Sequence, residues 1–159
     1  VLSTIFFCKK TGINFFKCTD IISCVAPIGI FLGRIANFIN GELYGKITTL
    51  PWGVIFPYGG NVSRHPSQIY EAILEGIVLF FIINFLALKK EILFKTGFIS
   101  SYFLIFYSIL RLVSESFREP DIHIGLIFNY FSMGALLSLL TIIIGLFIFF
   151  FIKKNEQNN

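Results

Sequence analysis

Four stretches of the chain are almost wholly apolar, and the polar residues gather between them. The stretches cover residues 21–39, 69–88, 98–113 and 124–152. A helix needs about 20 apolar residues to cross the hydrocarbon core of a bilayer, so each stretch is predicted to be a transmembrane helix. A shorter apolar run at residues 1–7 has the character of the end of another span. We therefore expect an all-α fold: a polytopic integral membrane helix bundle of about four complete transmembrane helices plus the end of another.

The composition supports a membrane protein. Hydrophobic residues make up 55% of the 159 residues and charged residues 14%, and the mean hydropathy is +0.80. A soluble domain is far less apolar than this. We treat residues 1–159 as a single membrane domain. Because the first residue is Val1 and the single methionine is Met133, we expect this domain to be the C-terminal part of a longer protein.

The lysines predict the orientation of the spans. They cluster in the first loop, in the third loop and at the tail: Lys9, Lys10, Lys17, Lys89, Lys90, Lys95, Lys153 and Lys154. Short cytoplasmic loops carry an excess of basic residues, so these segments are predicted to be cytoplasmic. Residues 40–68 and about 114–123 are then predicted to face outward. Topology thus explains the net charge of +4, and we expect no nucleic-acid partner.

No metal site is expected. Cys8, Cys18 and Cys24 show no CxxC spacing, and His65 lies far along the chain from His123. Neither pattern resembles a zinc site. The three thiols are predicted to be reduced, structural groups near the cytoplasmic face.

Arg34 stands inside the first predicted span. A guanidinium in the hydrocarbon region costs at least about 2.5 kcal/mol, so such a residue normally faces a cavity lined by protein or water and marks a functional site. Asn37 follows three residues later on the same helical face. Nothing in the apolar surroundings requires either side chain, so we predict that both serve the function of the protein.

A polar stripe runs along the third predicted span. Its members follow at i, i+4, i+7, i+8 and i+11: Tyr107, Arg111, Ser114, Glu115 and Arg118. At about 100° per residue these positions share one face of a helix. Arg111 and Glu115 are spaced to form an ion pair.

The charged residues are predicted to lie at similar depth. Arg34 sits about 9 Å inside the outer end of its helix, at about 1.5 Å per residue, and Arg111 is at a comparable depth. Glu71 and Glu75 begin the second span from the same side. We therefore expect the charges to converge in the outer half of the membrane, where an anionic lipid head group would meet a cavity in the bundle.

A purely structural role is the alternative for these charges. Arg34 and Arg111 would then extend to the membrane interface, or would pair with Glu42 and Glu115 for packing alone. The residue pattern leaves both roles open.

The predicted outer loop between the first two spans combines rigid turns, aromatic residues and an imidazole. Its notable residues are Pro51, Trp52, Pro57, Tyr58, Gly59, Gly60, Arg64, His65 and Pro66. This mixture predicts a lid or a vestibule over the bundle. Trp52 and Tyr58 are predicted to be anchors at the membrane interface. His65 is either a hydrogen-bonding loop residue or a catalytic base.

Four blocks of the sequence carry most of these polar residues. They are GRIANFINGELYG at residues 33–45, RHPSQIYEA at 64–72, YSILRLVSESFREPD at 107–121 and IGLIFNYFSMG at 124–134. In this order they resemble the conserved blocks of the bacterial prolipoprotein diacylglyceryl transferase family. The four blocks cover nearly the whole chain, which makes the resemblance specific.

The resemblance implies a reaction and a place in the cell. It implies transfer of the diacylglyceryl group of phosphatidylglycerol to the lipobox cysteine thiol of a prolipoprotein signal peptide, with formation of a thioether and release of glycerol phosphate. No metal or organic cofactor takes part in this family. The expected location is the bacterial cytoplasmic (inner) membrane, as a multi-pass protein whose site faces the outer side.

The resemblance also implies a set of residues that bind phosphatidylglycerol. The family's lipid-binding arginine falls on Arg34, and the same signature contains Asn37, Glu42 and Gly45. Arg118 follows in the REPD tail of the third block and joins this set. A planar guanidinium suits the role, because it holds two phosphate oxygens at once.

A second set of residues is implied for catalysis. The Tyr, Arg and Glu of the family's late block fall on Tyr107, Arg111 and Glu115. Arg111 is expected to stabilise the charge that develops on the leaving phosphate. A lipobox thiol of pKa about 8.5 must lose its proton before it attacks, so a base is needed. Glu115, Tyr107 and His65 are the candidates, in no particular order.

Other kinds of membrane protein remain to be weighed. A permease subunit or a lipid-binding scaffold would use a line of intramembrane arginines as an ion or lipid path. A transporter would show broken helices and a repeated half, and neither is visible. An intramembrane serine protease would need a histidine within a span, which neither His65 nor His123 provides.

Overall fold

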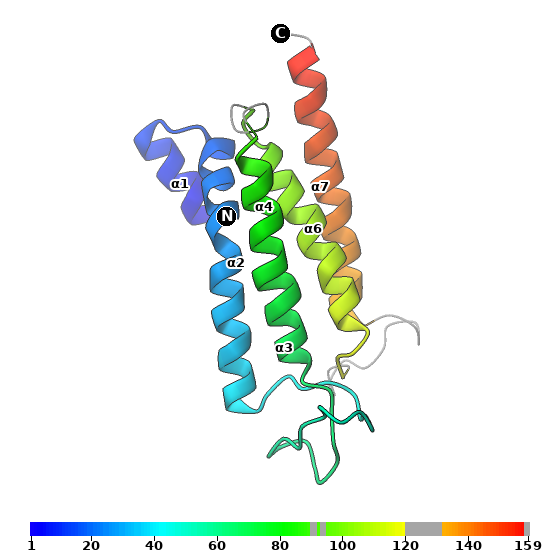
Figure 1. Cartoon of the computed structure of the whole chain (residues 1–159). Coiled ribbons are helices and arrows are strands. Elements are labelled where there is room, and N and C mark those ends of the chain that lie inside the picture. The colour runs from blue at the N-terminus through cyan, green and yellow to red at the C-terminus, as the bar shows by residue number, and fades with distance from the viewer. Residues whose placement is uncertain (90–91, 93–94, 120–131, 158–159) are drawn as a thin grey trace.

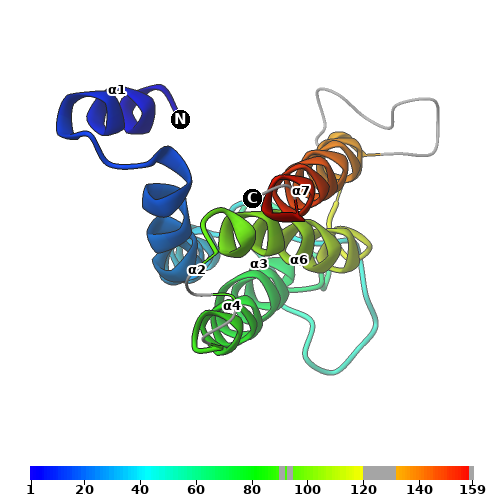
Figure 2. The same cartoon turned by 90° about the horizontal axis from the view of Figure 1, so that it is seen from above.

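The computed structural model describes residues 1–89, 92, 95–119 and 132–157. Its elements are α1 (Leu2–Thr11), α2 (Phe15–Asn40), α3 (Ser67–Glu71), η1 (Ala72–Val78), α4 (Leu79–Ala87), α6 (Phe98–Glu115) and α7 (Met133–Gln157). Figure 1 shows a bundle of upright helices, and Figure 2 shows α6 between α4 and α7. Four helical segments are long and apolar enough to cross a membrane: Phe15–Asn40, Ser67–Ala87, Phe98–Glu115 and Met133–Asn155. The expected all-α polytopic bundle is therefore confirmed.

α2 begins at Phe15, before the first apolar stretch at residues 21–39. A cap explains the early start, because the side-chain oxygen of Asn14 accepts hydrogen bonds from the N–H groups of Phe16 and Lys17 at 2.9 and 3.3 Å. The helix ends at Asn40 and is capped by Gly41, whose φ of 69° is left-handed and suits a glycine. Capping rather than hydropathy therefore sets the length of this helix.

The second span is one continuous helix made of α3, η1 and α4. It covers Ser67–Ala87, close to the predicted residues 69–88. Its middle section, Ala72–Val78, is π-helical, and short π-helical sections are rare and frequently lie at functional sites. Gly76 in this section packs closely on α2, since a Cβ there would lie only 2.6 Å from the Cβ of Phe31. The missing side chain lets the two helices approach each other.

α7 packs along α6, as Figure 2 shows from above. Gly145 makes this approach possible, because a Cβ there would lie 2.9 Å from the Cγ1 of Ile105. α7 starts at Met133 and continues to Gln157, whereas the predicted last span ran from residue 124 to 152. Residues 124–131 lie outside the described part of the chain, and so does His123.

The two ends of the bundle differ in charge. The described lysine-rich segments lie at the end where α2 and α6 begin and where α4 and α7 finish (Figure 1). The loop of residues 41–66 lies at the opposite end, beside the last turn of α6 and the first turn of α7. This is the arrangement that alternating lysine-rich and lysine-poor loops require.

The loop of residues 41–66 is attached to the end of α6. Gly45 forms an antiparallel bridge with Arg118. The Lys46 N–H donates to the carbonyl oxygen of Phe117 at 2.9 Å, and the Lys46 Nζ donates to the carbonyl oxygen of Ser116 at 2.9 Å. The loop is therefore an ordered wall of the bundle end.

Arg64 stabilises the interior of this loop. Its Nε donates to the carbonyl oxygen of Gly59 at 2.9 Å, and its Nη1 lies 3.2 Å from a carboxylate oxygen of Glu119. The indole of Trp52 and the ring of Tyr58 remain more than half exposed. Such exposed amphipathic rings suit the predicted anchoring at a membrane interface.

Candidate functional site

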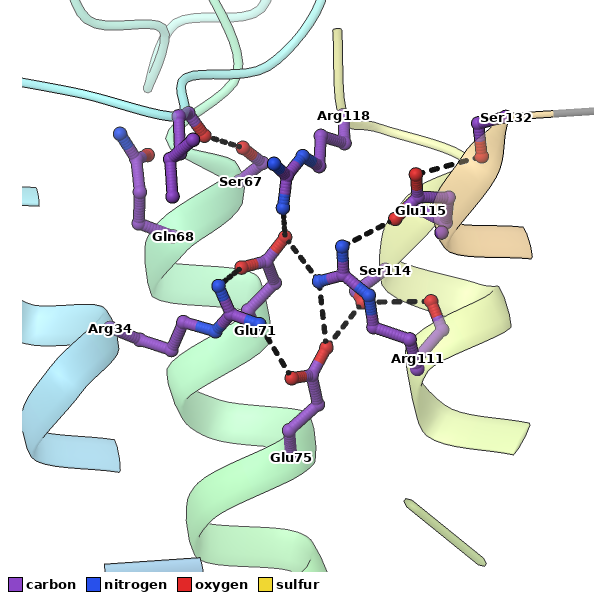
Figure 3. A network of polar contacts seen from close by, with 12 residues as sticks. Arg34, Ser67, Gln68, Glu71, Glu75, Arg111, Ser114, Glu115, Arg118 and Ser132 are labelled. Atoms are coloured by element: carbon purple, nitrogen blue, oxygen red, sulfur yellow. Dashed lines mark hydrogen bonds and ion pairs between the residues drawn. The ribbon is translucent and has the colours of Figure 1, made fainter. Parts of the chain in front are cut away.

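Two buried carboxylates join α2 to α6 at the end of the bundle that carries the loop of residues 41–66. Glu71 and Glu75 are both 0% exposed. Arg34 of α2 places Nη1 2.9 Å from Glu71 and Nη2 3.2 Å from Glu75. Arg111 of α6 places Nη1 2.8 Å from Glu71 and 3.2 Å from Glu75. As Figure 3 shows, each carboxylate is thus shared by two guanidinium groups that come from different helices.

Further polar groups hold the α6 side of this network. Arg111 also pairs through Nη2 with Glu115 at 2.6 Å, one turn further along α6. The Ser114 hydroxyl donates to Glu75 at 2.9 Å, and the Ser132 hydroxyl donates to Glu115 at 2.8 Å. Ser132 lies just before α7, so three helices and the start of a fourth meet at this cluster (Figure 3).

Arg118 completes the outer rim of the cluster. Its Nη1 lies 3.6 Å from the Oε1 of Glu71, and Figure 3 shows its guanidinium above Glu71, on the side of the loop. Glu71 therefore interacts with three arginines. We refer to Arg34, Glu71, Glu75, Arg111, Glu115 and Arg118 as the charge cluster.

Burial explains why these charges occur as a network. An isolated carboxylate without water would be strongly destabilised, and a close guanidinium compensates much of that desolvation cost. The side chains of Arg34 and Arg111 keep 17% and 10% of their surface exposed, while the two inner carboxylates keep none. The arginines therefore keep an accessible edge, while the glutamates that pair with them are fully buried.

Local helix geometry brings the two glutamates together. Glu71 and Glu75 are four residues apart, which places them on the same side of the second span. Glu75 lies within the π-helical section, next to Gly76. Because Gly76 lets α2 approach closely, Arg34 reaches both carboxylates. The sequence pattern that sets this half of the site is therefore an acid pair at i, i+4 followed by a glycine.

The structure decides the pairing that the sequence left open. Arg111 pairs with Glu115, as the i, i+4 spacing predicted. Arg34 pairs with Glu71 and Glu75, and not with Glu42, the partner considered in the purely structural alternative. Glu42 does not pair with Arg34 because it lies beyond the end of α2, where its Oε1 accepts a hydrogen bond from the Asn40 side chain.

Asn37, Glu42 and Gly45, from the same sequence block as Arg34, shape the end of α2 and the loop of residues 41–66. The Asn37 carbonyl oxygen accepts the Glu42 N–H at 3.1 Å, and the Glu42 carbonyl oxygen accepts from the Gln68 side chain at 2.6 Å. Gly45 lies where backbone segments cross, because a Cβ there would be 2.5 Å from the carbonyl oxygen of Phe117. These contacts give all three residues a role in building the wall next to the charge cluster.

His65 lies outside the charge cluster, in a group of aromatic residues. Its Nδ1 is 3.2 Å from the Tyr70 hydroxyl, which also accepts the indole N–H of Trp52 at 2.8 Å. The imidazole packs edge-on against Phe117, with ring centroids 5.4 Å apart. An apolar groove of about 380 Å³ runs past His65, Trp52 and Tyr70 to Ile73.

Tyr107 is one turn of α6 away from Arg111. Its ring stacks on Phe103, with centroids 5.8 Å apart and an angle of 7° between the rings. Within the described residues its hydroxyl makes no hydrogen bond. The predicted stripe is therefore divided: Arg111, Glu115 and Arg118 belong to the charge cluster and Ser114 donates a hydrogen bond to it, while Tyr107 packs beside it.

Two residues of the charge cluster, and Ser132 beside it, were not predicted to be site residues. Glu71 and Glu75 were placed at the right depth from their position in the second span, but the sequence did not show that they bind both arginines. Ser132 lies in a block that the hydropathy assigned to the last span, and its hydroxyl caps the start of α7 through a hydrogen bond from the Ala135 N–H. The acid pair at the start of an apolar stretch was the available signal.

Comparisons with known proteins point to the same family as the four sequence blocks. The family model described as prolipoprotein diacylglyceryl transferase matches residues 1–151. The chain is 52% identical over 145 residues to a phosphatidylglycerol–prolipoprotein diacylglyceryl transferase of Rickettsia felis, covering 91% of the chain and 56% of the relative. Proteins with the same description from Rickettsia bellii and Rickettsia akari are 49% and 50% identical, over 93% and 91% of the chain. The chain spans 56% of the length of each of these relatives.

Proposed function

Because the chain belongs to the prolipoprotein diacylglyceryl transferase family, we propose that it carries the lipid phosphate site of an enzyme that transfers a diacylglyceryl group from phosphatidylglycerol to the lipobox cysteine of a prolipoprotein. The observation that supports this most directly is the pairing of Arg34 and Arg111 with the same two buried carboxylates. Neither a permease subunit nor a lipid-binding scaffold receives comparable support.

The proposed role of the two arginines is to hold the phosphate diester of phosphatidylglycerol. A guanidinium carries five N–H donors, and Arg34 directs one terminal nitrogen at Glu71 and the other at Glu75. The remaining donors are available to a phosphate. Because the carboxylates fix the orientation of both guanidinium planes, little reorganisation is needed when charge develops on the leaving group. Arg118 is proposed to extend the same phosphate site at the rim.

The proposed reaction is a displacement at carbon. The lipobox sulfur attacks the carbon of the diacylglyceryl group that carries the phosphate ester oxygen. A carbon–sulfur bond forms while that carbon–oxygen bond breaks. The electron pair of the broken bond leaves with glycerol phosphate, whose charge Arg34 and Arg111 stabilise. The thiol proton passes to a base before or during the attack.

Among the three candidate bases, we propose His65. Glu115 is held by Arg111 at 2.6 Å and by the Ser132 hydroxyl at 2.8 Å, so both contacts tie its carboxylate to the charge cluster. The Tyr107 phenol is a poor base near neutral pH. His65 uses Nδ1 toward Tyr70, and its Nε2 has no hydrogen-bond partner among the described residues. We assign Glu115 the role of positioning Arg111.

The proposed orientation places the charge cluster on the outer side of the bacterial cytoplasmic membrane. A cysteine introduced at Asn61, in the loop of residues 41–66, should then react with a membrane-impermeant maleimide added to intact cells. One introduced at Thr96, at the lysine-rich end, should react only after the cells are opened, because the basic end is expected to stay in the cytoplasm. Labelling of Thr96→Cys in intact cells would contradict both the orientation and the outward-facing site.

A chimera tests the proposed function directly. This chain is exchanged for its matching segment in the Rickettsia felis relative, which is 52% identical to it. We expect the chimera to shift a prolipoprotein on a gel and to add a diacylglyceryl mass to its lipobox peptide. A chimera that folds, inserts and leaves the peptide unmodified would argue against the proposed function.

The chain alone should be inactive in the same assay. It spans 56% of the relative, and a site for two acyl chains and a peptide needs walls that enclose both substrates. Residues 1–159 in detergent with phosphatidylglycerol should therefore leave the lipobox peptide unmodified, as judged by mass spectrometry. Detection of diacylglyceryl peptide with the chain alone would show that these residues suffice for transfer.

A further inference from the structure

A second cavity lies at the lysine-rich end of the bundle, far along the helices from the charge cluster. It has a volume of about 340 Å³ and is partly enclosed, which falls within the usual range of about 300–1,000 Å³ for small-molecule sites. Its lining comes from the start of α2, the end of α4 and the start of α6: Lys17, Asp20, Ile21, Cys24, Ala87, Thr96 and Ile99. The proposed transferase function uses none of these residues.

The lining is amphipathic along the membrane normal. Lys17, Ile21 and Cys24 follow at i, i+4 and i+7 on one face of α2, so Cys24 lies about 10 Å deeper than Lys17 at about 1.5 Å per residue. Thr96 also lines the cavity and lies just before α6 begins, at the lysine-rich end of the bundle. The cavity is therefore polar at the membrane surface and apolar toward the hydrocarbon core.

The acidic group in the wall is already hydrogen-bonded to the start of α6. Asp20 accepts hydrogen bonds from the backbone N–H of Gly97 at 2.6 Å and from that of Ser100 at 2.7 Å. The Ser100 hydroxyl donates to the same carboxylate at 2.5 Å. Asp20 thus binds the positive end of α6, where unpaired N–H groups favour an anion. Its charge is directed into the protein rather than into the cavity.

Lys17 is exposed, and its ammonium has no ion-pair partner among the described residues. We propose that this cavity binds an anionic phospholipid of the adjacent leaflet, with the phosphate at Lys17 and Thr96 and one acyl chain between Ile21, Cys24 and Ile99. Charge complementarity favours this ligand, because basic pockets between helices at the cytoplasmic side of membrane proteins take anionic head groups. The lipid would tie α2, α4 and α6 together at the end opposite the charge cluster.

Cys24 provides a probe at the bottom of this cavity. The full chain, with Cys8→Ser and Cys18→Ser so that one thiol remains, is reconstituted in vesicles of phosphatidylcholine or of phosphatidylcholine with about one third phosphatidylserine. Phosphatidylserine is chosen because it is not the proposed diacylglyceryl donor. We expect its presence to slow alkylation of Cys24 by a membrane-permeant maleimide about fivefold, since protection grows as 1 + [L]/Kd.

Two lysine variants complete the test. Lys17→Gln should restore the alkylation rate seen in phosphatidylcholine, because it removes the charge and leaves the apolar wall intact. Lys10→Gln removes an exposed charge that does not line the cavity, so protection by phosphatidylserine should persist. Equal alkylation rates in the two kinds of vesicle would overturn the proposal. Protection that survives Lys17→Gln would also overturn it, because lipid binding in the cavity would then not depend on an ion pair between Lys17 and the phosphate.

Discussion

Arg34→Ala should abolish lipid transfer by the chimera, with a loss of about 10³-fold or more in rate, because it removes a charged donor from the developing phosphate. Arg34→Lys should also be impaired, by about a hundredfold, although the charge is retained. An ammonium cannot keep the planar fork by which Arg34 spans Glu71 at 2.9 Å and Glu75 at 3.2 Å while it still faces a ligand. The measurement is the initial rate of prolipoprotein modification on gels.

Two comparisons make the Arg34 result specific. Lys10→Ala removes an exposed cation at the lysine-rich end and should leave the rate unchanged. Thermal unfolding of each variant in detergent separates a loss of chemistry from a loss of fold. Near-normal transfer by Arg34→Lys would reduce Arg34 to a point charge, and normal transfer by Arg34→Ala would remove it from the mechanism.

Glu71→Gln should destabilise the protein by about 3–5 kcal/mol, the usual effect of removing one partner of a buried ion pair. Glu71 is 0% exposed and lies 2.9 Å from Arg34, 2.8 Å from Arg111 and 3.6 Å from Arg118. Glutamine has nearly the same shape, so the effect reports the lost charge rather than a cavity. The free energy of unfolding in detergent and the transfer rate of the chimera should both fall.

Glu119→Gln is the matched control for Glu71→Gln. Glu119 pairs with Arg64 at 3.2 Å, but its side chain is 41% exposed, and exposed pairs contribute about 1 kcal/mol or less. The same chemical change should therefore have little effect at this position. If Glu71→Gln proved as mild as Glu119→Gln, the charge cluster would not be the element that holds α2 to α6.

Hydropathy was enough to establish the architecture. Four apolar stretches predicted four spans, and each corresponds to a membrane-length helix in the described chain. The physical reason is that lipid offers no hydrogen bonds, so an apolar segment of this length has to be a helix. The depth of Arg34 and Arg111 also followed from sequence, because the rise per residue of a helix is nearly constant.

Hydropathy did not predict where the helices end or which charged residues pair. α2 begins at Phe15 because Asn14 caps it, an effect that is local and too weak to be seen against a long apolar stretch. The i, i+4 pair of Arg111 and Glu115 was predicted because both residues belong to one helix. The partners of Arg34 could not be predicted because they lie on another helix, where spacing along the chain carries no information.

The amino-acid sequence by itself therefore determined the membrane class, the spans, the family blocks and the position of each charged residue along its helix. Each of these depends on composition or on distance along one helix. Only the tertiary structure decided that Glu71 and Glu75 join Arg34 to Arg111 and that His65 sits apart with Tyr70. The rotation of each helix about its axis sets these contacts. That rotation depends on close packing, such as Gly76 against Phe31, between residues distant in sequence.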